Sequence, residues 1–364
     1  MFQNWLQPLK GPVEALEDHQ FGRHIQRYTD ELPELKDTRV AIIGIGEEDA
    51  RAVRNELYRM SYPFRGLEIA DLGDVRNTET SFIIPLIREL LDSQIFPLIL
   101  GNAARQALAQ YKAFQSLQQL ISLAVVDERI AYSRESEDKE LYFLKEILDS
   151  KHSRLFHLSF IGCQAHFVPP GTFEYLDKRN FDYTRLGKAK AEPAELEPLI
   201  RDCDLLSINL SALKQADAPG QQNATPSGFT SEEACQIARY AGMSDKLKAL
   251  GLYGFQHSLD RESQTANAMA QMAWYFLDGF YHRKGDFPAS TDGLAEYIVD
   301  FKKMDYQLTF WRSDRSGRWW MQVPVKTRSK YQRHRLVPCS YNDYMLACKD
   351  ELPDRLLNAM RRFG

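Results

Sequence analysis

The sequence predicts a three-layer α/β/α fold built on a mainly parallel sheet. Short apolar runs alternate with segments of helical spacing from about residue 38 to residue 285. Such alternation is typical of βα units, in which parallel strands are covered by helices on both faces. The composition agrees, because 44% hydrophobic and 26% charged residues are the proportions of an ordinary globular protein.

Seven apolar runs are expected as strands, and three longer segments are expected as helices. The strands are predicted at 38–46, 66–74, 96–103, 121–127, 156–163, 204–211 and 247–255. The helices are predicted at 50–60, 81–94 and 266–284. The segment 213–229 is rich in Pro, Gly, Asn and Gln and directly follows a predicted strand. Long ordered loops in that position often carry function.

We expect three parts along the chain: an N-terminal helical lead (1–37), the α/β domain (38–285) and a C-terminal extension (286–364). In the extension, polar and apolar residues alternate over 306–325 on either side of Ser-Asp-Arg-Ser-Gly. That pattern predicts a β-hairpin. The segment 340–363 has helical spacing. The extension is therefore predicted to be a small hairpin followed by a helix.

Composition also excludes several classes of protein. The net charge of −4 does not steer the chain to nucleic acid or to a membrane surface. No apolar run approaches the roughly 20 residues of a membrane-spanning helix, and the N-terminus lacks the apolar core of a secretory signal. Five widely spaced cysteines, an odd number, favour reduced thiols. We expect a cytoplasmic protein.

The extension is locally basic and aromatic. Ten lysines and arginines but only two aspartates lie between residues 302 and 335. Basic residues with interleaved aromatic rings can bind single-stranded nucleic acid. Alternating aromatic residues in a hairpin more often form its buried face, and the basic side chains can pair with the acidic body or with a neighbouring subunit. The second interpretation is favoured, so nucleic acid is not an expected partner. The aromatic residues are Tyr306, Trp311, Trp319, Trp320 and Tyr331.

A polar site is predicted where strand 121–127 ends. The apolar run changes abruptly to polar residues at Asp127, and Arg129 follows two positions later. In a parallel α/β sheet, ligands bind at the carboxyl ends of the strands. Asp127 is therefore expected in a crevice at that edge.

Several motifs, and the order of the elements along the chain, resemble those of the ureohydrolase family, which includes arginase, agmatinase and formimidoylglutamase. They are Asp-Leu-Gly-Asp at 71–74, Ala-Arg-Ala-Val-Arg-Asn-Glu-Leu at 50–57, and Gly-Phe-Thr at 228–230 with two glutamates just beyond. The resemblance spans roughly residues 38–282. It implies an arginase-like fold, trimers or hexamers, and hydrolysis of guanidino or formimino carbon–nitrogen bonds by two Mn²⁺ ions.

The metal-ligand motifs of that family are largely absent here. Its Gly-Gly-Asp-His corresponds to 101–104, its Asp-Ala-His-x-Asp to 127–131, and its Ser-Phe-Asp-x-Asp to 207–211. One of six expected ligands remains, and a dimanganese centre needs several anionic oxygens. The family's later substrate-site Glu falls near Gly254. The former metal-site positions are Ala104, Asp127, Arg129, Ala131, Asn209 and Ser211.

Two functions follow as hypotheses. The first is a non-catalytic ureohydrolase-fold protein that binds or scaffolds through the vacated pocket or the extension. The alternative is a hydrolase of non-peptide carbon–nitrogen bonds with a rebuilt active site. We expect neither a metal cofactor nor membrane association. We do expect self-association, and a protein or a small anionic ligand as partner. Asp127 and Arg129 are predicted to form an ion pair. A ligand in the pocket would meet Asn102, Arg105, Arg129 and His257.

Overall fold

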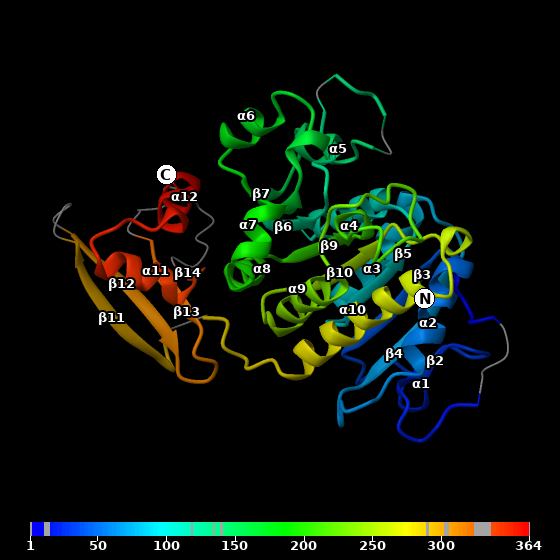
Figure 1. Cartoon of the computed structure of the whole chain (residues 1–364). Helices are drawn as coiled ribbons and strands as arrows, with labels where there is room; N and C mark the ends of the chain where they lie inside the picture. The colour runs from blue at the N-terminus through cyan, green and yellow to red at the C-terminus, as the bar shows by residue number, and fades with distance from the viewer. Residues whose placement is uncertain are drawn as a thin grey trace.

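The computed structural model describes residues 2–10, 15–117, 119–133, 135–138, 141–288, 291–301, 306–323 and 336–363. Figure 1 shows a large α/β body with a small antiparallel sheet, in orange, beside it. Within these ranges, no helix is both long enough and apolar enough to cross a bilayer.

The central sheet of the body has ten strands, most of them parallel. Its order is β1-β4-β3-β5-β10-β9-β6-β7-β8, with β2 also paired to β4 and with β1 antiparallel. All seven strands predicted from the sequence are present. The bounds are β1 Leu6–Gln7, β2 Gln26–Arg27, β3 Val40–Ile45, β4 Ile69–Val75, β5 Phe96–Gly101, β6 Ile121–Val126, β7 Leu155–Cys163, β8 Asp182–Arg185, β9 Leu205–Asn209 and β10 Ala249–Tyr253.

Helices cover both faces of this sheet, so the predicted three-layer fold is confirmed. One apolar core lies under α1 (Phe21–His24), α2 (Glu47–Tyr58), α7 (Leu186–Ala191), α8 (Leu196–Arg201), α9 (Ser231–Met243) and α10 (Gln264–Tyr281). A second core lies under α3 (Thr80–Asp92), α4 (Ala107–Gln115), α5 (Leu144–Leu148) and α6 (Thr172–Asp177). The strands are apolar on both sides because each face is buried.

The N-terminal lead is much less helical than predicted. Its described residues form a 3₁₀ turn at Phe2–Asn4, the two short strands β1 and β2, and the four-residue helix α1. The lead therefore extends the edge of the sheet. A strand of two residues is too short to show alternation, which is why β1 and β2 were not predicted.

The C-terminal extension is larger than the predicted hairpin and helix. The hairpin is present as β12 (Tyr306–Ser313) and β13 (Trp319–Gln322), but β11 (Leu294–Phe301) and β14 (Leu336–Cys339) flank it in a four-stranded antiparallel sheet. The predicted helix is two helices, α11 (Tyr341–Cys348) and α12 (Asp354–Phe363). Pro353 stands just before α12, where its ring cannot continue a helix from the residues before it.

The extension docks on its own body, and Arg318 of the basic stretch pairs with Glu197 of α8 at 3.4 Å, as the favoured interpretation of its charge expected. Arg201 of α8 lies 4.5 Å from the centre of the Trp320 ring and donates to the backbone oxygens of Trp319 and Cys339. From the extension, Arg362 pairs at 3.0 Å with both Asp182 and Asp202. Trp319 and Trp320 are both buried. The aromatic side of the hairpin is thus a packing surface.

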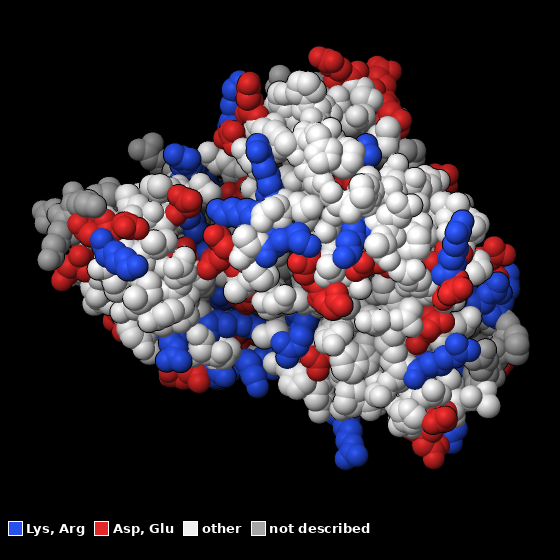
Figure 2. Space-filling view, viewed as in Figure 1, with Lys and Arg blue, Asp and Glu red and all other residues white. Residues whose placement is uncertain are grey.

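Much of the basic stretch lies outside the described residues. Figure 2 shows acidic and basic side chains interspersed over the face in view, with no broad area of one sign among the described residues. The residues of the basic, aromatic stretch that lie outside the described ranges are Lys302, Lys303, Lys326, Arg328, Lys330, Tyr331, Arg333 and Arg335, and the side chain of Tyr306 is also outside them.

Candidate functional site

Four neighbouring strands deliver the predicted site residues to one edge of the sheet. Strands β5, β10, β9 and β6 are adjacent and parallel, so their carboxyl ends meet. A pocket of about 370 Å³ opens there. Its lining includes eight of the nine predicted positions: Asn102, Ala104, Arg105, Asp127, Arg129, Ala131, Asn209 and Ser211.

Asp127 lies at the floor of the pocket and is held by neutral donors. The Ser211 hydroxyl donates to its Oδ1 at 2.6 Å, and the Asn209 amide donates to its Oδ2 at 2.9 Å. The backbone N–H of Arg129 donates to Oδ1 at 3.2 Å. Burial raises the pKa of Asp127, and the hydrogen bonds from Ser211 and Asn209 oppose that rise. The two side-chain donors stand at former ligand positions.

The predicted ion pair between Asp127 and Arg129 is wrong. The Arg129 guanidinium instead donates through Nε to Glu128 at 3.0 Å and lies 4.7 Å from the centre of the Phe167 ring. Successive side chains on an extended segment diverge, and Glu128 is fully buried and needs a donor. Thr225 supplies the second donor to Glu128 at 2.9 Å. Arg129 therefore pairs with its neighbour Glu128 and forms no direct ion pair with Asp127.

The other predicted ligand-binding residues are already engaged. Asn102 donates to Asp49 at 2.9 Å and accepts from Gln106 at 2.7 Å. Arg105 donates to Glu146 at 2.5 Å. Burial alone would raise the pKa of Glu146, but its cationic partners lower it. These contacts fix the wall of the pocket beside Asp127.

His257 does not line this pocket. Its imidazole is exposed, and its backbone N–H donates to Asp49 at 2.8 Å. It therefore lies beside the site without facing into it.

Sequence reasoning singled out the long loop after β9 but did not name the residues that it contributes to the pocket. Gln221, Gln222 and Asn223 of this loop line the pocket together with Gln256. The Gln and Asn content of 213–229 was the available signal, since carboxamides at a strand-end loop are suited to polar contacts. Gly254 has a φ of +92°, and a Cβ there would lie 2.3 Å from Oδ1 of Asn209. A glutamate at this position would displace Asn209.

The residues at this edge do not fit a dimanganese centre. Mn²⁺ prefers several carboxylate oxygens with imidazole, whereas the pocket offers one carboxylate that already accepts three hydrogen bonds. Across the described residues, no three His, Cys, Asp or Glu side chains gather in a way that could hold a metal ion.

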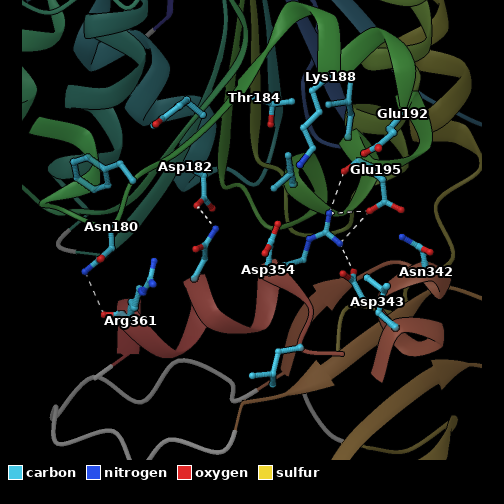
Figure 3. Close-up of a pocket in the computed structure, with 18 of the residues that line it drawn as sticks. Asn180, Asp182, Thr184, Lys188, Glu192, Glu195, Asn342, Asp343, Asp354 and Arg361 are labelled. Carbon is cyan, nitrogen blue, oxygen red and sulfur yellow. Dashed lines mark hydrogen bonds and ion pairs between the residues drawn. The ribbon is translucent and has the colours of Figure 1, made fainter. Parts of the chain in front are cut away.

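A larger cavity of about 690 Å³ lies at the seam between the body and the extension (Figure 3). Asp182 and Glu195 enter it from the body, and Asp343 and Asp354 enter it from the extension. Arg355 bridges the two sides by pairing with Glu195 at 3.2 Å and with Asp343. These ion pairs hold the extension in place.

Comparison with solved structures finds the same fold in several enzymes. Trypanosoma cruzi formiminoglutamase with Mn²⁺ is 16% identical, with a TM-score of 0.63 over 69% of this chain and 96% of that one. Formimidoylglutamase from Bacillus subtilis is 18% identical, with a TM-score of 0.64 over 77% and 98%. A hypothetical agmatinase from Burkholderia thailandensis is 20% identical, with a TM-score of 0.59 over 72% and 90%.

Sequence comparison gives the family. Among curated proteins, none matches the chain. The model of the arginase family matches residues 44–278. This range contains the end of β3, the strands β4 to β10 and all the strand ends that form the pocket. Since the match covers more than half of its length, the chain belongs to the arginase family.

Proposed function

We propose that this chain is a non-catalytic member of the arginase family that uses the pocket at the sheet edge to bind a small polar ligand. The observation that carries the proposal is the set of contacts around Asp127. Asn209 and Ser211 stand where carboxylate ligands are expected, and both donate to the one carboxylate that remains. Hydrogen bonds between strand ends thus occupy oxygens that a metal ion would need.

The pocket has nevertheless stayed open. Collapse of an abandoned site would fill it with side chains, because protein interiors are packed to high density. Here about 370 Å³ remains, with small residues at Ala104 and Ala131 and several carboxamides on its walls. Open space with convergent polar groups is typical of a ligand site. Binding is therefore the function that this edge supports best.

The alternative, a hydrolase with a rebuilt active site, has less support. Nucleophilic hydrolysis needs a nucleophile with a base that accepts its proton. Ser211 is the available hydroxyl, and its acceptor Asp127 is also committed to Asn209 and to the backbone N–H of Arg129. Among the described residues that line the pocket, none is His, Lys or Cys.

We also propose a cytoplasmic location. The five cysteines are free thiols, and reduced cysteines are typical of cytosolic proteins.

The test is metal content and activity together. The full chain would be loaded with Mn²⁺, freed of unbound metal, analysed for manganese, and assayed with arginine, agmatine and formimidoylglutamate. We expect far less than one Mn per chain and no product. About two Mn per chain, or hydrolysis of any of the three, would contradict the proposal.

A paired variant makes the result informative about the site. Asn209→Asp with Ser211→Asp returns two carboxylates beside Asp127. If these are former ligand positions, Mn²⁺ should raise the melting temperature of this variant and leave that of the wild type unchanged. A wild-type protein stabilised as much as the variant would show that the existing residues already hold the metal.

A further inference from the structure

Asp127 is a buried carboxylate that forms no direct ion pair with a described residue, although the charge of the nearby Arg129 also favours its ionised form. It is 4% exposed, and its three hydrogen-bond donors are an amide, a hydroxyl and a backbone N–H. The two guanidinium groups on the pocket wall belong to other carboxylates: Arg129 to Glu128 at 3.0 Å and Arg105 to Glu146 at 2.5 Å. A buried charge without a counter-charge is costly. The pocket floor therefore favours a positive ligand.

A second acceptor faces the pocket from the long loop. Gln221 is 5% exposed, and its Nε2 donates to the backbone oxygens of Leu210 at 2.8 Å and Ala218 at 2.9 Å. Two carbonyl acceptors on one side fix which end of the amide is nitrogen. Its Oε1 accepts no hydrogen bond from a described residue, and Gln221 lines the pocket.

Asn209 presents a third acceptor for the same reason. Its Nδ2 is committed to Asp127 at 2.9 Å, so its other end must be the carbonyl oxygen. That oxygen occupies the space that a side chain at Gly254 would take. The polar floor thus combines one negative charge with amide oxygens.

We propose that this floor binds the ammonium group of a small primary amine. An ammonium carries one positive charge and three N–H donors, which matches one carboxylate and two amide oxygens. This inference rests on the proposed binding function and names its ligand. A guanidinium fits less well, because it prefers both oxygens of a carboxylate, and Oδ1 of Asp127 already accepts from Ser211 and from Arg129 N–H.

The walls indicate what is attached to the ammonium. Ala104, Ala131 and Phe143 give the pocket an apolar side, and about 370 Å³ far exceeds the space of a bare ion. A short carbon chain therefore fits above the ammonium. A second cationic end is disfavoured because the described lining of the pocket offers no carboxylate besides Asp127. The ligand class is a monoamine.

The experiment titrates the full-length protein with n-butylammonium chloride and follows binding by calorimetry and by chemical-shift changes. Three matched solutes complete it: butyltrimethylammonium chloride, with the same charge but no N–H donor; potassium chloride; and sodium butyrate. We expect saturable binding of butylammonium, and binding weaker by about tenfold or more for the trimethyl analogue, since charge-assisted hydrogen bonds are lost.

Variants assign the binding to this pocket. Asp127→Asn should weaken butylammonium binding by about tenfold or more, and Ala104→Leu should weaken it by filling the apolar side without touching the floor. Ala104→Leu decides the matter if Asp127→Asn does not fold. Glu192→Gln removes a carboxylate from the larger cavity at the seam and should change nothing.

Several results would overturn the proposal. Among the solutes, these results are equal binding of the trimethyl analogue or of potassium, binding of butyrate alone, and no saturable binding of butylammonium. Among the variants, they are unchanged butylammonium binding in folded Asp127→Asn or Ala104→Leu, and loss of that binding in Glu192→Gln. Binding of butyrate alone would favour the anionic ligand that the sequence suggested. Failure of the proposed non-catalytic function would appear separately, as bound manganese or as hydrolysis, in a protein whose response to amines is measured independently.

Discussion

Ser211 donates a hydrogen bond of 2.6 Å to Asp127 across two strand ends that are 84 residues apart in the sequence. In the family pattern both positions carry metal-binding carboxylates, so metal ions would cross-link the ends of β6 and β9. In this chain the cross-link is a direct hydrogen bond, and Asn209 supplies a second one. The edge of the sheet can thus stay ordered without metal.

Ser211→Ala should lower the free energy of unfolding by about 1–3 kcal/mol, because it leaves a buried carboxylate short of a donor. Chemical denaturation with unchanged m-values would measure this loss. Ser116→Ala is a suitable control, since the Ser116 hydroxyl donates only to a backbone oxygen of its own helix. Equal effects of the two substitutions would mean that Ser211 does not support Asp127.

Asp127 should make stability depend on pH in the direction opposite to most carboxylates. Burial raises its pKa in the folded protein above the unfolded value of about 3.9. Between these two values the folded state binds more protons than the unfolded state, so the contribution of Asp127 to stability falls as pH rises. We therefore expect the unfolding free energy of the wild type, minus that of Asp127→Asn, to decrease from about pH 4 toward neutrality. A difference that grows with pH would refute the buried, unbalanced carboxylate.

The sequence predicted the body well because its signals are local and repeated. Every buried strand of the parallel core is an apolar run, and the order of motifs placed the former ligand positions at adjacent strand ends. The partners of side chains were less predictable. Asp127, Glu128 and Arg129 are consecutive, and sequence alone does not say which carboxylate turns toward the guanidinium. That choice depends on the direction of each side chain after the strand ends.

The extension was predicted only in part, again for physical reasons. The hairpin has a clear turn with alternating residues, whereas β14 is four residues long and contains Pro338. Proline is disfavoured inside strands, so this segment did not indicate a strand. The alternation in β11, where Val299 and Phe301 are buried between exposed residues, was an available signal. Docking by arginines followed from the charge pattern, but the particular acidic partners did not.

Arg362 should be a stabilising contact between the last helix and the body. It is 7% exposed and pairs at 3.0 Å with both Asp182 and Asp202. Burial alone would raise the pKa of Asp202, but Lys246 and Arg362 outweigh burial and lower it to about 2. Arg362→Ala should cost about 3 kcal/mol, since it leaves two carboxylates with less compensation.

The neighbouring Arg361 provides the control for this change, because its side chain is exposed. Arg361→Ala should change stability by less than about 0.5 kcal/mol. The contribution of Asp202 is present above its unfolded pKa of about 3.9 and is lost as pH falls toward 2. The cost of Arg362→Ala should therefore shrink in acid. A cost that stays constant with pH would separate Arg362 from these carboxylates.

Truncation at about residue 290 should lower the melting temperature of the body. Arg201 is 3% exposed in the full chain and would lose the Trp320 ring and the backbone oxygens of Trp319 and Cys339. The apolar surface that packs against the extension would be exposed at the same time. Thermal unfolding and dye binding would measure both effects. An unchanged melting temperature in a soluble truncated protein would make the extension a detachable arm.

A double-mutant cycle on Asp127 and Arg129 tests the pairing at the site. The Arg129 guanidinium contacts Glu128 and Phe167, and only its backbone N–H reaches Asp127. Asp127→Ala and Arg129→Ala should therefore be additive within about 0.5 kcal/mol. Glu128→Ala and Arg129→Ala should couple by roughly 0.5–1 kcal/mol, toward the low end for ion pairs because Arg129 is partly exposed. Stronger coupling in the first cycle than in the second would mean that Arg129 is the counter-charge of Asp127. The pocket would then not need an ammonium ligand to balance that carboxylate.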